Sequence, residues 1–144
     1  MIERHESVIV TTFVRALVPL AQLFALYVLI HGHDSPGGGF QAGVILAASY
    51  IVLALGLGRN ALERRVDEPW WIALAAAGVL LYVAVGAMGL ARSTFLDYSA
   101  LPVPLDAVRA RWLGILLIET GVAATVMATL VVIFCRLAGE GPSR

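Results

Sequence analysis

Two ionisable residues stand inside long apolar stretches of this 144-residue sequence. Arg15 lies in the stretch from about Val8 to Ile30, and Glu119 lies in the last stretch, which ends near Cys135. An ionisable side chain at the centre of a membrane span costs at least about 2.5–3.5 kcal/mol, so it usually faces protein, water or the path of an ion. A carboxylate in such a place can take and release protons or coordinate a cation such as Na⁺. Glu119 is therefore a candidate ion-path residue, with a helix–helix hydrogen bond or a salt bridge to another subunit as the structural alternative.

A stripe of polar residues accompanies Arg15. It consists of Thr11, Arg15, Pro19 and Gln22, whose spacing places them on one face of a helix. We expect this face to look inward, toward protein, and Arg15 and Gln22 to be further ion-path candidates. Pro19 cannot donate a backbone hydrogen bond to residue 15 and is expected to kink the helix. The alternative is a structural kink with an arginine that reaches back to the membrane surface.

Thr125 follows Glu119 in the same apolar stretch and is another candidate for the path of the ion. Small residues also recur there and in the preceding stretch, for example Gly121 and Gly78. Such residues are typical of helices that approach closely in membranes, so they predict packing and carry no chemistry.

A glycine-rich segment joins the first two apolar stretches. It reads His31-Gly32-His33-Asp34-Ser35-Pro36-Gly37-Gly38-Gly39-Phe40-Gln41-Ala42-Gly43. Pro36-Gly37 suits a type II turn, and exposed amides at the start of the next helix would favour an anion or a carboxylate from a partner. His33, which could titrate near neutrality at the membrane surface, and its neighbour Asp34 complete the ion-path candidates. A metal site is not expected because no further ligand pattern appears, and a plain tight hairpin is the alternative to a functional loop.

Four apolar stretches must position these residues. They run over about 8–30, 42–58, 70–90 and 112–135, and each is roughly long enough to cross a hydrocarbon core of about 30 Å. The chain is 60% hydrophobic and 14% charged, with a mean hydropathy of +0.87, which is more apolar than a soluble domain of this size could bury. We predict an all-α integral membrane protein: one membrane domain over 1–144, built as a bundle of four transmembrane helices with a Gly-rich loop between helices 1 and 2.

The composition excludes several chemistries. All ten basic residues are Arg, so neither a Schiff-base lysine nor a phosphate-loop lysine is available. Cys135 is the only cysteine, which leaves no intrachain disulfide and no cysteine cluster for a metal. No nucleophile–base pair, cofactor motif or basic patch for nucleic acid is recognisable. We therefore expect neither an enzyme nor a nucleic-acid-binding protein, and neither a cofactor nor a resident metal.

The arginines outside the four stretches predict the orientation. Six lie on the side of the two termini and three on the opposite side. Because cytoplasmic loops carry the excess of basic residues, both termini are predicted to be cytoplasmic. Tryptophans at the starts of the third and fourth stretches suit anchors at the membrane interface.

The glycine-rich segment also carries the motif Gly32-His33-x-x-Pro36-Gly37-Gly38-Gly39-Phe40-x-x-Gly43. This motif resembles the signature of the B subunit of the multisubunit Mrp/Mnh cation/proton antiporters, a small four-helix membrane protein. In the fourth stretch, Glu119-Thr120-Gly121-Val122 is similar to that family's acidic residue followed by Gly-Val. Chain length, the four spans and the loop position agree with the family over nearly the whole chain.

The resemblance implies a subunit of a complex that exchanges Na⁺ for H⁺ across a prokaryotic cell (inner) membrane. Its partners would be other membrane subunits of the antiporter, including large subunits related to those of respiratory complex I. Those large subunits carry buried lysines, so the absence of Lys here fits an accessory role, with Na⁺ and H⁺ as transported ions rather than cofactors. Two alternatives remain: the equivalent subunit of a redox-driven ion pump such as a membrane-bound hydrogenase, and a purely structural membrane subunit.

Overall fold

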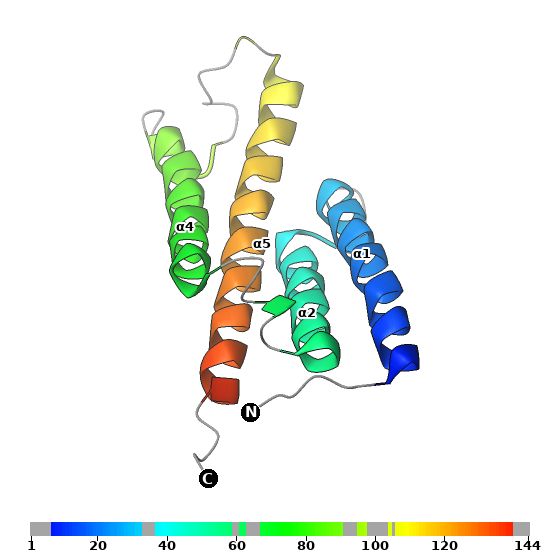
Figure 1. Cartoon of the computed structure of the whole chain (residues 1–144). Helices are drawn as coiled ribbons and strands as arrows, with labels where there is room; N and C mark the ends of the chain where they lie inside the picture. The colour runs from blue at the N-terminus through cyan, green and yellow to red at the C-terminus, as the bar shows by residue number, and fades with distance from the viewer. Residues whose placement is uncertain are drawn as a thin grey trace.

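Four long helices make up most of the described chain. The computed structural model describes residues 7–32, 37–58, 61–62, 67–90, 95–97, 104 and 106–139. Its long helices are α1 (Val8–Ile30), α2 (Gly39–Leu57), α4 (Glu68–Leu90) and α5 (Ala107–Gly139) (Figure 1). All four are long and apolar enough to cross a membrane. The predicted fold class, an all-α membrane protein with four transmembrane helices, is confirmed.

Two helices begin three or more residues earlier than the hydropathy predicts. α2 starts at Gly39 rather than near Ala42, and α5 starts at Ala107 rather than near Trp112. Asp106 accounts for the early start of α5, because its Oδ1 accepts a 3.0 Å hydrogen bond from the backbone N–H of Arg109 and so caps the first turn. Hydropathy marks the part of a helix that suits lipid, whereas a cap sets where the helical hydrogen bonds begin.

The helices lie side by side in the order α1, α2, α5, α4 (Figure 1). Each helix runs opposite to the one before it in the sequence, so the neighbours α2 and α5 are parallel. α5 packs against both α2 and α4, while α1 packs mainly on α2. The start of α1 and the end of α5 therefore lie at the same end of the molecule. α5 is central to the row, so a residue on α5 can face either neighbour depending on its position around the helix.

Small and apolar side chains fill the contacts between neighbouring helices. One cluster joins α1 to α2, and another joins α1, α2 and α5 near the glycine-rich segment. The third joins α2, α4 and α5 toward the end of α5 and consists of Ala47, Ala54, Leu62, Trp71, Ala128, Val131 and Cys135. At its edge the ring of Tyr50 meets the ring of Trp71 edge-on, with 5.0 Å between their centroids. This ring contact joins α4 to α2, although α4 packs mainly on α5.

Many apolar side chains are exposed on the outside of the four helices. In the most apolar window of each helix, the buried share ranges from 17% in α1 to 39% in α2. Large side chains such as Phe13, Phe24 and Leu80 are more than half exposed. Because burying such surface is worth about 25 cal/mol per Å² in water, the molecule requires lipid or neighbouring membrane helices around it.

Candidate functional site

Glu119 of α5 lies against the backbone of the glycine-rich segment. A Cβ atom placed on Gly32 would lie 3.0 Å from Glu119 Oε2, and one placed on Gly38 would lie 3.2 Å from Oε1. The side chain of Glu119 is half-buried, inside a helix that is apolar enough to span the membrane. The carboxylate and the glycine-rich segment, which the sequence presents 80 residues apart, therefore form one site. We call Glu119 together with Gly32, Gly38 and Gly39 the glycine–glutamate site.

Glycine is required in this site for two separate reasons. Gly38 has a φ of 128°, a conformation that side chains rarely adopt, and it directly precedes the first residue of α2. Gly39 and Gly43 permit close contact between backbones instead. A Cβ atom on Gly39 would overlap the backbone carbonyl of Glu119, and one on Gly43 would lie 2.8 Å from the carbonyl oxygen of Ala123. The start of α2 thus lies directly on the backbone of α5 for about one helical turn.

The site has favourable electrostatics for a carboxylate. The first N–H groups of a helix have no partner within the helix, and the helix dipole places partial positive charge at the same end. Glu119 lies at this end of α2, since its oxygens lie near the Cβ positions of Gly32 and Gly38. The sequence predicts that an anion or a partner's carboxylate would be favoured at these amides; in the structure a carboxylate of the same chain lies beside them. The spacing of Gly39 and Gly43 was the sequence signal for this close approach.

The other residues of the glycine-rich motif differ in where they lie relative to the site. Phe40 is 63% exposed. Gly37 packs against α1, where a Cβ atom would lie 3.3 Å from Val28 Cγ1. The predicted candidates His33 and Asp34 and the motif residue Pro36 lie outside the described residues. Within the described residues, no group of three or more His, Cys, Asp or Glu side chains is arranged to hold a metal ion.

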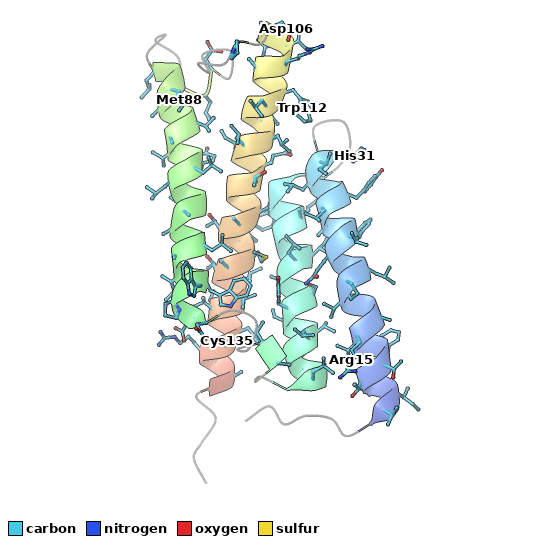
Figure 2. The ribbon with its side chains drawn as sticks, turned by 45° about the horizontal axis from the view of Figure 1, so that its top comes forward. Arg15, His31, Met88, Asp106, Trp112 and Cys135 are labelled. Carbon is cyan, nitrogen blue, oxygen red and sulfur yellow. The ribbon has the colours of Figure 1, made fainter. Side chains whose placement is uncertain are left out.

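His31, at the end of α1, has local contacts (Figure 2). Its ring stacks on the ring of Tyr27 with 4.3 Å between centroids. Its Nδ1 also lies 3.1 Å from the backbone carbonyl oxygen of Tyr27, at hydrogen-bonding distance. These contacts tie the ring to the last turn of α1, next to Gly32.

The polar stripe on α1 divides into a half-buried and an exposed part. Gln22 Nε2 donates a 3.4 Å hydrogen bond to Ser49 Oγ on α2, and Ser49 Oγ donates to the carbonyl of Leu46 at 2.7 Å. Arg15 and Pro19 are exposed. The prediction that the whole stripe faces inward is therefore wrong for these two within this chain. The buried face is set by apolar residues, Val14, Val18, Ala25 and Leu29, which lie to one side of the stripe.

Ser49 is a polar residue that the sequence reasoning missed. It is the buried partner of Gln22, with only 3% of its surface exposed. A serine inside an apolar stretch was the available signal. It joins α1 to α2 within the membrane-spanning part of both helices and has no contact that would place it in the glycine–glutamate site.

Thr125 faces a different neighbour from Glu119. Its Oγ1 donates a 3.1 Å hydrogen bond to the backbone carbonyl of Ala75 on α4. Close packing surrounds this bond, because a Cβ atom on Gly121 would lie 2.8 Å from the carbonyl oxygen of Gly78. The predicted close approach of the small residues is confirmed here. Six residues along a helix correspond to about 240° of rotation, so Thr125 points away from the glycine–glutamate site.

A small apolar groove lies beside this contact between α4 and α5. Its volume is about 150 Å³, and its lining residues are Gly78, Val79, Tyr82, Val122, Thr125 and Val126. Where α4 begins and α5 nears its end, Arg136 of α5 donates a 2.7 Å hydrogen bond from Nε to Glu68 Oε1 of α4. These features attach α4 to α5 and lie apart from the glycine–glutamate site.

Comparison with known proteins agrees with this architecture. A family model described as the domain related to the MnhB subunit of Na⁺/H⁺ antiporter matches residues 9–132. The B subunit of the Na⁺/H⁺ antiporter of Alkalihalophilus pseudofirmus is 24% identical over 88% of this chain and 94% of its own length. The B subunit of the Na⁺/H⁺ antiporter of Bacillus subtilis is 28% identical over 89% of this chain and 95% of its own length.

A much longer relative also matches. The probable K⁺/H⁺ antiporter A/B subunit of Rhizobium meliloti is 28% identical over 88% of this chain, but the match covers 13% of that relative. The family model covers both the glycine-rich segment and Glu119, the two parts that the fold brings together. The chain belongs to the family of domains related to the MnhB subunit of Na⁺/H⁺ antiporters, and it is a small membrane subunit of a multisubunit antiporter of this kind.

Proposed function

We propose that the glycine–glutamate site forms part of the path of Na⁺ or H⁺ through the antiporter. The observation that carries this proposal is the position of the Glu119 carboxylate against the non-helical backbone of Gly32 and Gly38. An ionisable residue inside a membrane span is costly and is usually found where an ion or proton passes. Non-helical backbone at membrane depth is likewise found where it is buried in protein or lines a water-filled cavity.

The chemistry of the site suits either ion. A carboxylate oxygen can hold a proton, and carboxylate and backbone carbonyl oxygens are the ligands that hard cations take in proteins. In membrane transporters, interrupted helices bring helix ends and free carbonyl groups together at the sites of coupling ions. Here the start of α2 lies beside the carboxylate of Glu119. Within this proposal, Gln22 and Thr125 stabilise contacts between helices and Arg15 lies outside the path.

A structural role for the same carboxylate is the competing function. The backbone of Gly39 packs directly on that of Glu119, so the carboxylate could serve only to stabilise the start of α2. The two functions differ in their consequences for transport. A structural carboxylate can be replaced by a neutral side chain that keeps the packing, whereas a path residue must also be able to bind and release an ion.

The test is to replace Glu119 within the complete antiporter. We expect Glu119→Gln to leave the amount of assembled complex close to wild type, because the amide has the same shape as the carboxyl group. We expect the same variant to lower Na⁺-driven proton movement at least about a hundredfold, which is the lower end of the effect of a group that acts in proton transfer. The measurement is fluorescence dequenching of a pH-sensitive dye in everted vesicles, with complex content determined on the same vesicles.

Two further variants complete this test. Glu119→Asp keeps the charge and should restore part of the activity and shift its dependence on pH. Glu68→Gln is the matched control, because it neutralises a glutamate that forms an ion pair with Arg136 in the last turn of α5, away from the glycine–glutamate site. Wild-type antiport and an unchanged pH profile in Glu119→Gln would assign the carboxylate to structure alone.

We also infer the setting in which the site works. The arginine distribution supports an orientation with both termini in the cytoplasm of a prokaryotic cell, and the multi-pass fold supports a place in its inner membrane. The names of the relatives support other antiporter subunits as partners. The longer A/B relative supports a large A-type partner as one neighbour, since the match covers a small part of that protein.

A further inference from the structure

An arginine lies exposed on the membrane-spanning part of α1. Arg15 is seven residues after Val8, which places it about 10 Å along the helix from that end (Figure 2). Its side chain is exposed, and the described residues contain no ion pair that includes it. Exposure of a cation to hydrocarbon is costly, so this side chain requires either an anion or the membrane surface.

A second polar group lies on the same flank of α1. Pro19 is inside the helix and is exposed. Proline has no N–H group, so the carbonyl of Arg15 lacks the donor that residue 19 would normally provide. The arginine side chain can extend toward lipid headgroups, but the backbone carbonyl cannot follow it. Backbone groups without a helical partner are tolerated at membrane depth where protein or water covers them, which argues against plain lipid on this flank.

Near Arg15, the exposed surface of α1 has two flanks of different character, and Leu23 and Leu26 continue the first of them as apolar surface. One carries Thr12, Arg15, Ala16 and Pro19, whose spacing of three, four and seven residues places them on one face. The other carries bulky apolar side chains: Phe13, Leu17, Leu20 and Phe24. Small residues allow the backbone of another helix to approach closely, whereas large apolar side chains suit lipid tails. We call the first set the Arg15 flank.

We propose that the Arg15 flank is the docking surface for a transmembrane helix of another antiporter subunit, and that this helix presents an Asp or Glu carboxylate to Arg15. α1 stands at the end of the row and packs mainly on α2, so its outer side is accessible to such a helix. The partner carboxylate neutralises the arginine, and the partner helix covers the carbonyl of Arg15. This inference concerns assembly and does not depend on the proposed role of Glu119.

The first experiment measures assembly of the complete antiporter. Arg15→Leu should lower the amount of this chain that co-purifies with an affinity-tagged partner subunit at least about tenfold, because the partner's carboxylate is left without its cation. Arg15→Lys should retain much of the assembly. Leu20→Ala on the opposite flank is the matched control and should assemble like wild type. When the chain is expressed without its partners, Arg15→Leu should reach the membrane at least as well as wild type, because insertion of leucine is easier than that of arginine.

The second experiment identifies what occupies the flank. In a Cys135→Ser background, which removes the only cysteine, Thr12→Cys carries a photoactivatable maleimide inside the assembled complex. We expect a cross-link to a membrane helix of another antiporter subunit that contains Asp or Glu at the corresponding depth. Exchange of that residue with Arg15 should restore assembly lost in either single variant. Wild-type assembly of Arg15→Leu, or cross-links to lipid alone or to a second copy of this chain, would overturn the proposal.

Discussion

At the scale of single residues, the site depends on what glycine lacks. The missing Cβ atom of Gly39 allows the carbonyl of Glu119 to lie against the first turn of α2. Gly38 adopts a backbone conformation, with a φ of 128°, that residues with a Cβ atom rarely adopt. Glycine costs roughly 0.5–1 kcal/mol relative to alanine in a helix, so it lowers the stability of α2 unless a close contact compensates. The contact with α5 provides that compensation and fixes the position of the Glu119 backbone.

Gly39→Ala should therefore weaken the contact between α2 and α5. The added methyl group would overlap the backbone of Glu119, and overpacking of this kind costs typically about 1–3 kcal/mol. We expect a lower midpoint of thermal unfolding for the purified antiporter and a loss of antiport activity. Ala48→Val, which enlarges an exposed residue of the same helix, is the control and should change neither. Equal stability of the two variants would count against the close contact.

At the scale of helices, α5 divides the candidate residues between two neighbours. Glu119 and Ala123 face α2, whereas Gly121 and Thr125 face α4. One helix thus holds the glycine–glutamate site on one side and, on the other, a close-packed contact that includes the hydrogen bond of Thr125. Substitutions on the Glu119 side should therefore affect transport, whereas substitutions on the α4 side should affect stability.

Gly78→Val should destabilise the contact between α4 and α5 while sparing the other side of α5. A Cβ atom at this position would overlap the carbonyl of Gly121 and Thr125 Oγ1. We expect a loss of about 1–3 kcal/mol, measured as a lower thermal midpoint by tryptophan fluorescence of the purified complex. The antiport rate per assembled complex at low temperature should stay near wild type. A selective loss of antiport without loss of stability would contradict this division of α5.

The existence of the four helices could be predicted because hydrocarbon demands long apolar stretches, and such stretches are visible in any sequence. The meeting of Glu119 with Gly38 and Gly39 could not, because it depends on the rotation and register of α5 against α2. The inward face predicted for Arg15 failed for a related reason. Polar spacing shows which residues share a face, but the surrounding apolar residues, such as Val14 and Val18, decide which face is buried.

At the scale of the whole molecule, the chain is an open row rather than a closed bundle. α1 and α4 stand at its ends, and large apolar side chains remain exposed along both. A chain with so much uncovered surface is suited to assembly, in agreement with its membership of a family of antiporter subunits.

Isolation of the tagged chain from its native membrane in mild detergent should therefore recover other antiporter subunits. We expect large antiporter-like membrane subunits in the eluate, identified by mass spectrometry, and no iron–sulfur or hydrogenase proteins. An unrelated tagged membrane protein of similar size controls for nonspecific recovery. Recovery of redox proteins would instead assign the chain to a redox-driven pump, and recovery of the chain alone would contradict a stable complex.

The even number of membrane-spanning helices in the described part of the chain has a consequence for gene fusion. Because α1 begins and α5 finishes at the same end of the row, either end of the chain can be joined to a neighbouring protein whose own terminus lies on that side of the membrane. Such a fusion leaves the membrane orientation of both proteins unchanged. It also raises the effective concentration of each protein near its partner. We therefore infer that the module can be carried within a longer polypeptide or encoded separately, with the same orientation of its helices in both cases.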